Sequence, residues 1–213
     1  MKGLAVVSGG MDSVSMLYQY QEQIEAVVNF NYGSKHNDIE TTFAVYHAQL
    51  LNKAFYAISL PFVGSLFKSD LLKSGAPVPH GHYEDESMKA TVVPFRNGIM
   101  LSIAIGLAES LGLEAVYIGN HAGDHAIYPD CRSEFIMAMR KAAIEGTYLK
   151  VNIISPFCHA TKRDIAKIGT LAGADLAKTY SCYEGQEVHC GKCGTCVERK
   201  EALLGFDRTI YRN

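Results

Sequence analysis

The feature of this sequence that most constrains its fold is a regular alternation of short apolar runs with longer stretches of helical spacing. The runs cover residues 4–7, 24–30, 55–60, 115–118 and 151–154. Runs of this length, bounded by turn residues, are typical of strands buried on both faces. Strands that alternate with helices predict a doubly wound α/β fold, in which helices cover both faces of a parallel sheet.

The predicted helices lie between and after these strands. The clearest has Ile99, Ile103, Leu107 and Leu111 at every fourth residue, which places all of them on one helical face. The others cover residues 14–21, 39–51, 135–143 and 164–171. Sheets of this kind bind ligands beyond the carboxyl ends of their strands, so the residues that follow each strand are candidates for a ligand site.

Composition narrows the class of protein. The chain has 213 residues, of which 48% are hydrophobic and 20% charged, as in ordinary globular proteins, and its net charge is -2. We find no basic run suited to nucleic acid and no apolar stretch long enough to span a bilayer. The first strand leads directly into a motif, without a signal peptide, so we expect a cytoplasmic protein. We predict a main domain over 1–179 and a C-terminal segment over 180–213 packed on it.

A glycine-rich loop follows the first predicted strand. It consists of Ser8, Gly9, Gly10, Met11, Asp12 and Ser13. Adjacent glycines let a backbone turn sharply and approach a ligand, and backbone N–H groups at a helix start bind anions. The Asp12 carboxylate could cap the helix or hold a magnesium ion that bridges to phosphates. The loop lacks the lysine of a Walker A motif, and the alternative is an ordinary glycine turn.

Four of the six cysteines lie within fifteen residues. Cys182, Cys190, Cys193 and Cys196 have the spacing C-x7-C-x2-C-x2-C, which predicts a structural zinc site with four thiolates. An iron–sulfur cluster has similar spacing and is the competing metal. A redox dithiol needs fewer cysteines, and a disulfide framework does not suit a reducing compartment. We expect His189 to neighbour the metal site.

Other polar groups gather where predicted strands end or helices begin. They lie in residues 31–36, 96–97, 119–124, 128–132 and 161–164. An ordinary strand-to-helix turn, or a helix cap with a solvated arginine, would also explain the first two groups. The long stretch 61–94 interrupts the alternation and predicts either a lid over the site or a surface excursion.

The glycine loop, SGGMDS, resembles the SGGxDS signature of the PP-loop ATP pyrophosphatases. The resemblance implies the adenine nucleotide α-hydrolase-like form of the α/β fold. It also implies that the loop holds the β,γ-pyrophosphate of ATP while the α-phosphorus is attacked. AMP would pass to a substrate oxygen, which turns a poor leaving group into a good one.

Several further motifs occur in an order that resembles the 7-cyano-7-deazaguanine synthase family. After the loop come FNYGSKH at 30–36, VPFRN at 93–97, GNHAGD at 119–124, YPDCRSEF at 128–135 and the cysteines of 182–196. The resemblance spans nearly the whole chain. Two departures touch the expected substrate pocket: Ala126-Ile127 stands where Ser-Gly is frequent, and Lys35 where Arg is common.

This resemblance implies ATP-dependent conversion of 7-carboxy-7-deazaguanine and ammonia to 7-cyano-7-deazaguanine, in queuosine-type biosynthesis. ATP would activate first the acid and then the amide, which loses its oxygen to become the nitrile. The family implies structural zinc, magnesium with ATP, and frequent homodimers. A glutaminase domain does not fit in this length, so ammonia would be free or delivered by a partner. The product could feed tRNA or DNA modification.

The resemblance also implies residue roles. Ser8, Gly9, Gly10, Met11, Asp12 and Ser13 would bind ATP, and Cys182, Cys190, Cys193 and Cys196 would bind zinc. Asp12, Arg96 and Lys162 would be catalytic, the two cations by neutralising phosphate charge. Lys35, His36, Asp124, Asp130 and Arg132 would bind the substrate.

Three other functions fit parts of the pattern. Another PP-loop adenylating enzyme, one that acts on tRNA, shares the loop but usually carries more basic surface. A zinc-knuckle nucleic-acid-binding module would bind RNA or DNA in a salt-sensitive way without ATP turnover, which the net charge of -2 disfavours. A non-catalytic paralogue is disfavoured by the intact loop.

Overall fold

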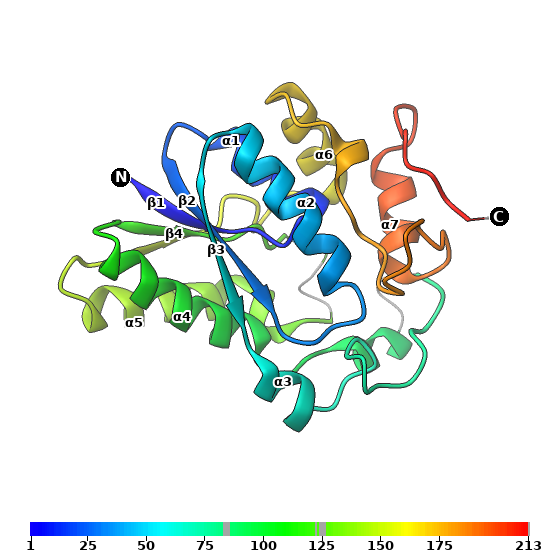
Figure 1. Ribbon diagram of the computed structural model, residues 1–213, viewed down its shortest axis with the longest axis horizontal. Coiled ribbons are helices and arrows are strands. Elements are labelled where there is room, and N and C mark those ends of the chain that lie inside the picture. The colour runs from blue at the N-terminus through cyan, green and yellow to red at the C-terminus, as the bar shows by residue number, and fades with distance from the viewer. Residues whose placement is uncertain (83–85, 122, 124–126, 213) are drawn as a thin grey trace.

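The computed structural model describes residues 1–82, 86–121, 123 and 127–212, and its centre is a parallel sheet (Figure 1). The strand order within this part of the chain is β3-β2-β1-β4-β5, and every neighbouring pair is parallel. The strands are β1 (Gly3–Val6), β2 (Ile24–Asn31), β3 (Ala54–Ser59), β4 (Ala115–Tyr117) and β5 (Asn152–Ile154). The predicted parallel α/β sheet is confirmed.

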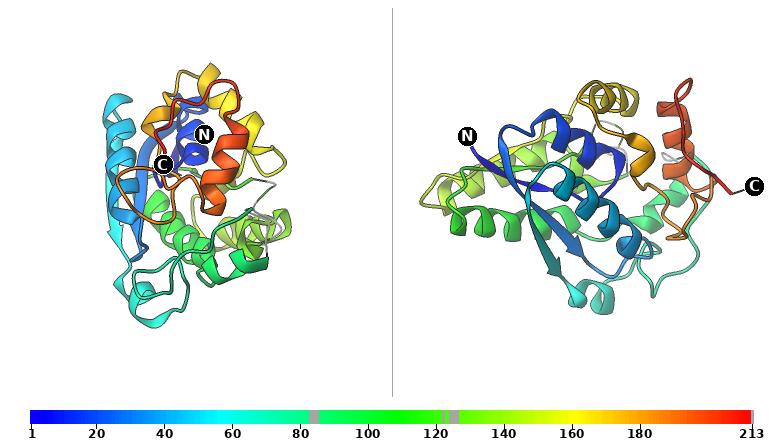
Figure 2. Two further views of the ribbon diagram at one scale, coloured as in Figure 1. Left: turned by 90° about the vertical axis from the view of Figure 1, so that its right-hand side faces the viewer. Right: turned by 45° about the horizontal axis from the view of Figure 1, so that its top comes forward.

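Helices cover both faces of the sheet, as a doubly wound fold requires (Figures 1 and 2). The helices are α1 (Met11–Gln19), α2 (Asn37–Leu50), α3 (Pro61–Leu66), α4 (Arg96–Ser110), α5 (Ser133–Gly146), α6 (Lys162–Leu171) and α7 (Gly194–Ala202). Helices α4 and α5 pack on one face, and α1, α2 and α6 pack on the other. The apolar runs follow from this arrangement, because successive residues of a strand face opposite layers.

The central strand shows this directly. In β1, Leu4 is buried in the layer of α4 and α5, whereas Ala5 and the following Val7 are buried in the layer of α1 and α6. The strand order reverses at β1, because β2 lies on one side and β4 on the other. The connections after these strands leave on opposite faces, and such a switch point opens a crevice at the carboxyl edge.

Two expectations about element boundaries need correction. The helix expected at 14–21 begins earlier, at Met11, because Gly10 is extended and precedes the first helical turn. The stretch 61–94 contains α3 and a 3₁₀ turn, Glu86–Thr91. It is tied to the main core by buried Val63, Leu71 and Leu72, which explains how so long a connection is held. Its role as a lid stays a prediction.

The C-terminal segment lies beyond the carboxyl ends of the strands, where α7 faces the end of the sheet (Figure 1). Ala202 and Leu203 pack into the core layer of α1 and α6, whereas the four cysteines form a cluster of their own. Arg199 is fully buried. It donates hydrogen bonds to Thr179, Ser181 and Thr209 and to a backbone carbonyl, so it ties α7 to both flanking segments. The boundary at 179/180 stays a prediction.

Helices α1 and α6 approach each other closely at one glycine. A Cβ placed on Gly169 would lie 2.2 Å from Ser15 Oγ and 2.8 Å from Ser15 Cβ. Both residues are buried, so neither can move toward solvent. The glycine therefore allows the close approach of α1, which follows the phosphate loop, and α6, which carries Lys162.

We expect Gly169→Ala to lower the free energy of unfolding by about 1–3 kcal/mol, because overpacking displaces the two helices. Urea unfolding followed by circular dichroism would measure this change. Gly106→Ala, at an exposed position of α4, is the matched control, since alanine there adds a Cβ with no neighbouring side chain or other element of the described structure within 4 Å. It is expected to stabilise the helix by about 0.5–1 kcal/mol. Equal effects of the two changes would contradict the close approach.

Candidate active site

The glycine loop joins β1 to α1 at the switch point of the sheet. Gly9 has φ +103°, which favours glycine, and a Cβ there would lie 2.1 Å from the Glu40 carbonyl oxygen of α2. Gly10 directly precedes α1, so the free N–H groups of the first turn lie at the loop. The two glycines thus bring a helix N-terminus close to α2, and such an N-terminus binds anions.

The two serines of the loop hold its shape. The Ser8 N–H donates to Ser13 Oγ at 3.2 Å, and the Gly10 N–H donates to Ser8 Oγ at 3.1 Å. The Ser13 hydroxyl in turn donates to the Gly10 carbonyl at 3.1 Å. These hydrogen bonds fix the backbone conformation of the loop. Both serines also line the cavity described next.

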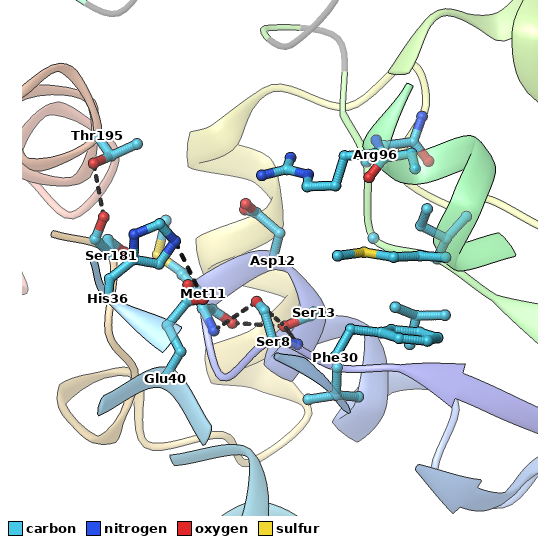
Figure 3. Close-up of a pocket in the computed structure, with 18 of the residues that line it drawn as sticks. Ser8, Met11, Asp12, Ser13, Phe30, His36, Glu40, Arg96, Ser181 and Thr195 are labelled. Atoms are coloured by element: carbon cyan, nitrogen blue, oxygen red, sulfur yellow. Dashed lines mark hydrogen bonds and ion pairs between the residues drawn. The ribbon is translucent and has the colours of Figure 1, made fainter. Parts of the chain in front are cut away.

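A cavity of about 200 Å³ opens beside this loop at the carboxyl edge of the sheet (Figure 3). Its walls come from the loop, the end of β2 and start of α2, the start of α4, and the C-terminal segment. Residues that line it include Ser8, Gly10, Met11, Asp12, Ser13, Tyr32, His36, Glu40, Arg96, Asn120, Tyr128, Lys162, Tyr180, Ser181, Tyr183 and Thr195. The structure therefore brings together the loop and both predicted catalytic cations.

Asp12 lies in a charged cluster at one side of this cavity. Lys162 Nζ donates to Asp12 Oδ2 at 2.6 Å and lies 3.3 Å from Glu198 Oε2. His121 Nε2 is 3.2 Å from the same Nζ. The other oxygen, Asp12 Oδ1, is buried and has no hydrogen-bond partner among the described residues. An oxygen in that state is suited to a cation, the ligand expected of this carboxylate.

Arg96 enters the cavity from the start of α4, and its side chain and that of Asp12 reach into the same space (Figure 3). Its guanidinium donates to the Tyr32 hydroxyl at 3.1 Å and lies 5.5 Å from the centre of that ring. Phe95, the residue before the helix, has φ +53°. This left-handed conformation is costly outside glycine and is found most at functional sites. It sets the direction in which α4, and hence Arg96, starts.

His36 and Glu40 form a buried pair on the opposite wall, 3.5 Å apart (Figure 3). Burial raises the pKa of Glu40 to about 8 and lowers the pKa of His36 to about 3. At neutral pH the pair is therefore mostly uncharged, a protonated acid beside a neutral imidazole. The His36 ring also stacks on Tyr183 of the C-terminal segment at 5.3 Å, which joins this wall to the next.

Of the residues expected to bind substrate, Lys35, Asp130 and Arg132 are not among the described residues that line the cavity. Asp124 lies outside the described residues, as does Ala126. Asp130 is buried and accepts from the Asn97 N–H at 2.8 Å, so it caps the start of α4. Lys35 donates to the carbonyls of Asp70, Gly75 and Ala76 and so holds the stretch 61–94. Arg132, two residues after Asp130, is exposed. The expected substrate roles stay predictions.

The four cysteines of the predicted metal site converge. Their sulfur atoms all lie within 4.8 Å of one another, and all four residues are buried. Backbone N–H groups of Cys190 and Cys193 donate to cluster sulfurs at 3.3 and 3.2 Å, an arrangement that stabilises thiolates. His189 lies outside the quartet and accepts from the Ser181 N–H at 3.1 Å. Four converging sulfurs fit a tetrahedral metal ion.

The sequence patterns missed most of the wall that the C-terminal segment contributes. Tyr180, Ser181, Tyr183 and Thr195 line the cavity, and Ser181 and Thr195 are hydrogen-bonded to each other. They flank Cys182 and Cys196, so proximity to the metal ligands was the one available signal. Glu198 carried no signal at all, because its contact with Lys162 depends on how α7 docks.

Comparisons with known proteins identify the family of this chain. A family described as queuosine biosynthesis protein QueC matches residues 2–207. The chain belongs to the QueC family. A 7-cyano-7-deazaguanine synthase from Porphyromonas gingivalis is 56% identical over 200 residues, 94% of this chain and 91% of the relative. The one from Desulfotalea psychrophila is 49% identical, covering 98% and 97% of the two chains.

A third QueC-type relative, the 7-cyano-7-deazaguanine synthase of Paracoccus denitrificans, is 44% identical over 100% of this chain and 94% of its own. The predicted family resemblance is thereby confirmed. Among the residues that the structure describes, none of the helices has the length and apolar character to cross a membrane.

Proposed function

We propose that this chain makes 7-cyano-7-deazaguanine from 7-carboxy-7-deazaguanine, ammonia and ATP. The name of its close relatives supports the product. The observation that carries the proposal is that one cavity has the SGGMDS loop on one side and Arg96 and Lys162 reaching in from two other helices. Two cations facing a helix N-terminus suit a polyphosphate, and the remaining space suits the acceptor to which AMP is passed.

The chemistry needs a leaving group twice. In the first half, a carboxylate oxygen attacks the α-phosphorus of ATP, and pyrophosphate leaves to give the acyl adenylate. Ammonia then displaces AMP and loses a proton, which gives the amide. In the second half, the amide oxygen is adenylated in the same way, and loss of AMP and of both N–H protons leaves the nitrile. Each half therefore releases one pyrophosphate and one AMP.

The residues of the cavity have distinct roles in this proposal. The loop backbone and the first turn of α1 hold the pyrophosphate, and Arg96 and Lys162 neutralise the charge that builds on it. Asp12, through its unpartnered Oδ1, would hold magnesium, which screens the phosphate charge when ATP is bound. The positioning of these groups before ATP arrives is what accelerates attack at phosphorus.

The proposal extends to the metal and to the partners. We assign zinc to the four cysteines, because four thiolates in a closed site suit structural zinc and the reaction transfers no electrons. Ammonia is free or delivered by another protein. A homodimer in the cytoplasm stays our prediction.

Incubation of the purified protein with ATP, magnesium, ammonium and 7-carboxy-7-deazaguanine tests the function. Mass spectrometry should show the amide first and then the nitrile, with two AMP formed for each nitrile. Leaving out ATP or ammonium should remove the amide and the nitrile. If neither mass appears from protein that carries its metal, the proposal is wrong. If AMP forms only when tRNA is added, the chain is instead a PP-loop enzyme acting on tRNA.

A further inference from the structure

Lys162 is held between two carboxylates that come from distant parts of the chain. Its Nζ lies 2.6 Å from Asp12 Oδ2 in the phosphate loop and 3.3 Å from Glu198 Oε2 in α7. All three side chains are largely buried, with exposed fractions of 15%, 19% and 14%. Glu198 belongs to none of the sequence motifs, yet it contacts the cation that the proposed reaction needs.

We propose that Glu198 is a positioning residue for Lys162. It keeps the Lys162 ammonium beside the phosphate loop when the Asp12 carboxylate binds the magnesium ion of ATP. This inference rests on the proposed function, in which Asp12 binds the magnesium ion that accompanies ATP. It deepens that proposal by giving the metal-bearing C-terminal segment a direct part in ATP binding.

The need for a second anchor follows from the charges. In the described structure Asp12 Oδ2 is bonded to Lys162, while Oδ1 has no hydrogen-bond partner. A carboxylate that binds a divalent cation loses much of its attraction for a neighbouring ammonium, because the two positive charges repel. A lysine has a flexible four-carbon stem and leaves a position that is no longer held. Glu198, on a separate helix, still attracts it as an ion pair at 3.3 Å, a contact that lacks hydrogen-bond geometry in the described structure.

Helix α7 is well placed to provide a rigid anchor. It begins directly after Cys193 and contains Cys196, so two of the four clustered cysteines define its first turn. The next residue after Glu198 is Arg199, which is fully buried and donates to Thr179 Oγ1 at 2.9 Å and Thr209 Oγ1 at 2.8 Å. Glu198 thus lies between two fixed points.

His121 also faces this contact. Its Nε2 is 3.2 Å from Lys162 Nζ, 3.8 Å from Asp12 Oδ2 and 3.9 Å from Glu198 Oε1. The His121 imidazole therefore shares the surroundings of the ammonium with both carboxylates. Asp12 and Glu198 both attract Lys162, and Glu198 is the carboxylate that comes from outside the phosphate loop.

The test measures ATP affinity by calorimetry with magnesium and without any deazaguanine, so its result does not depend on nitrile formation. We expect Glu198→Gln to raise the Kd about tenfold, a loss of about 1.4 kcal/mol. Glu201→Gln is the matched control, because Glu201 lies on the same helix with its side chain 66% exposed. It should change the Kd less than about twofold.

A double-mutant cycle separates positioning from a merely structural role. In a Lys162→Met background, Glu198→Gln should have no further effect on the Kd, because the side chain it positions is gone. Metal content and melting temperature show that each variant is folded. An unchanged Kd for Glu198→Gln, or the same tenfold loss in the Lys162→Met background, would overturn the inference.

Discussion

Asp12→Asn is expected to lower the rate of nitrile formation by about 10²–10³-fold, the size seen when one preorganised electrostatic group is removed. The asparagine keeps the shape of the side chain but removes the charge that holds Lys162 at 2.6 Å. It also replaces an oxygen pair suited to a cation by one oxygen and one N–H donor. Initial rates at saturating ATP, with pyrophosphate release as the readout, would measure the loss.

The control for this change is Asp38→Asn. Asp38 is exposed at the start of α2 and pairs with Lys73 at 2.9 Å, outside the cavity. Exposed pairs of this kind contribute at most about 1 kcal/mol, so its activity should match the wild type. Both variants should keep their metal and melting temperature. Asp12→Asn activity within about twofold of the wild type would contradict the role assigned to this carboxylate.

Cys193→Ser is expected to release the metal and to unfold the C-terminal segment. Structural zinc contributes about 10–16 kcal/mol of apparent binding free energy at pH 7, far more than a segment of this size can replace by packing. The loss should abolish nitrile formation as well, because Tyr180, Ser181 and Tyr183 form one wall of the cavity. Metal analysis would measure the release of the metal, and thermal unfolding and limited proteolysis after residue 180 would measure the unfolding of the segment. The yield of nitrile would measure the loss of activity.

Cys158→Ala provides the comparison for that variant. Cys158 is buried but lies outside the quartet. The Cys158→Ala variant should therefore keep one zinc per chain and lose only the stability that a small core side chain contributes. Iron in place of zinc in the wild-type protein would overturn the metal assignment. A Cys193→Ser protein that keeps its zinc and its cavity wall would contradict the structural role of the cluster.

The parts of this molecule that sequence could predict are those in which the signal is local. The run at Leu4 and Val7 and the glycines that follow report a buried strand and a sharp turn, whatever the rest of the chain does. The cysteine spacing is similarly local, because a metal knuckle brings together residues a few positions apart. The order of the motifs added the family resemblance and the chemistry that it implies, and the comparisons confirm the family.

Local sequence patterns could not predict contacts between segments that are distant in the sequence. Asp130 and Lys35 carry charges suited to a ligand, yet Asp130 caps α4 and Lys35 binds the carbonyls of a long connection. Either role could be assigned only once the neighbouring segment was placed. Glu40 is a similar case, because its raised pKa comes from burial that no feature of α2 announces. Tertiary packing decides which polar residue faces the cavity.

The position of the C-terminal wall has a consequence for protein synthesis. The phosphate loop is synthesised before Tyr180, Ser181, Tyr183 and Glu198, which lie far later in the sequence. Until that segment is made, Lys162 lacks its contact with Glu198, and the cavity lacks the wall that Tyr180, Ser181 and Tyr183 provide. Under the proposed function, the ATP site is therefore complete only after the C-terminal segment has been made and has folded against the rest of the chain.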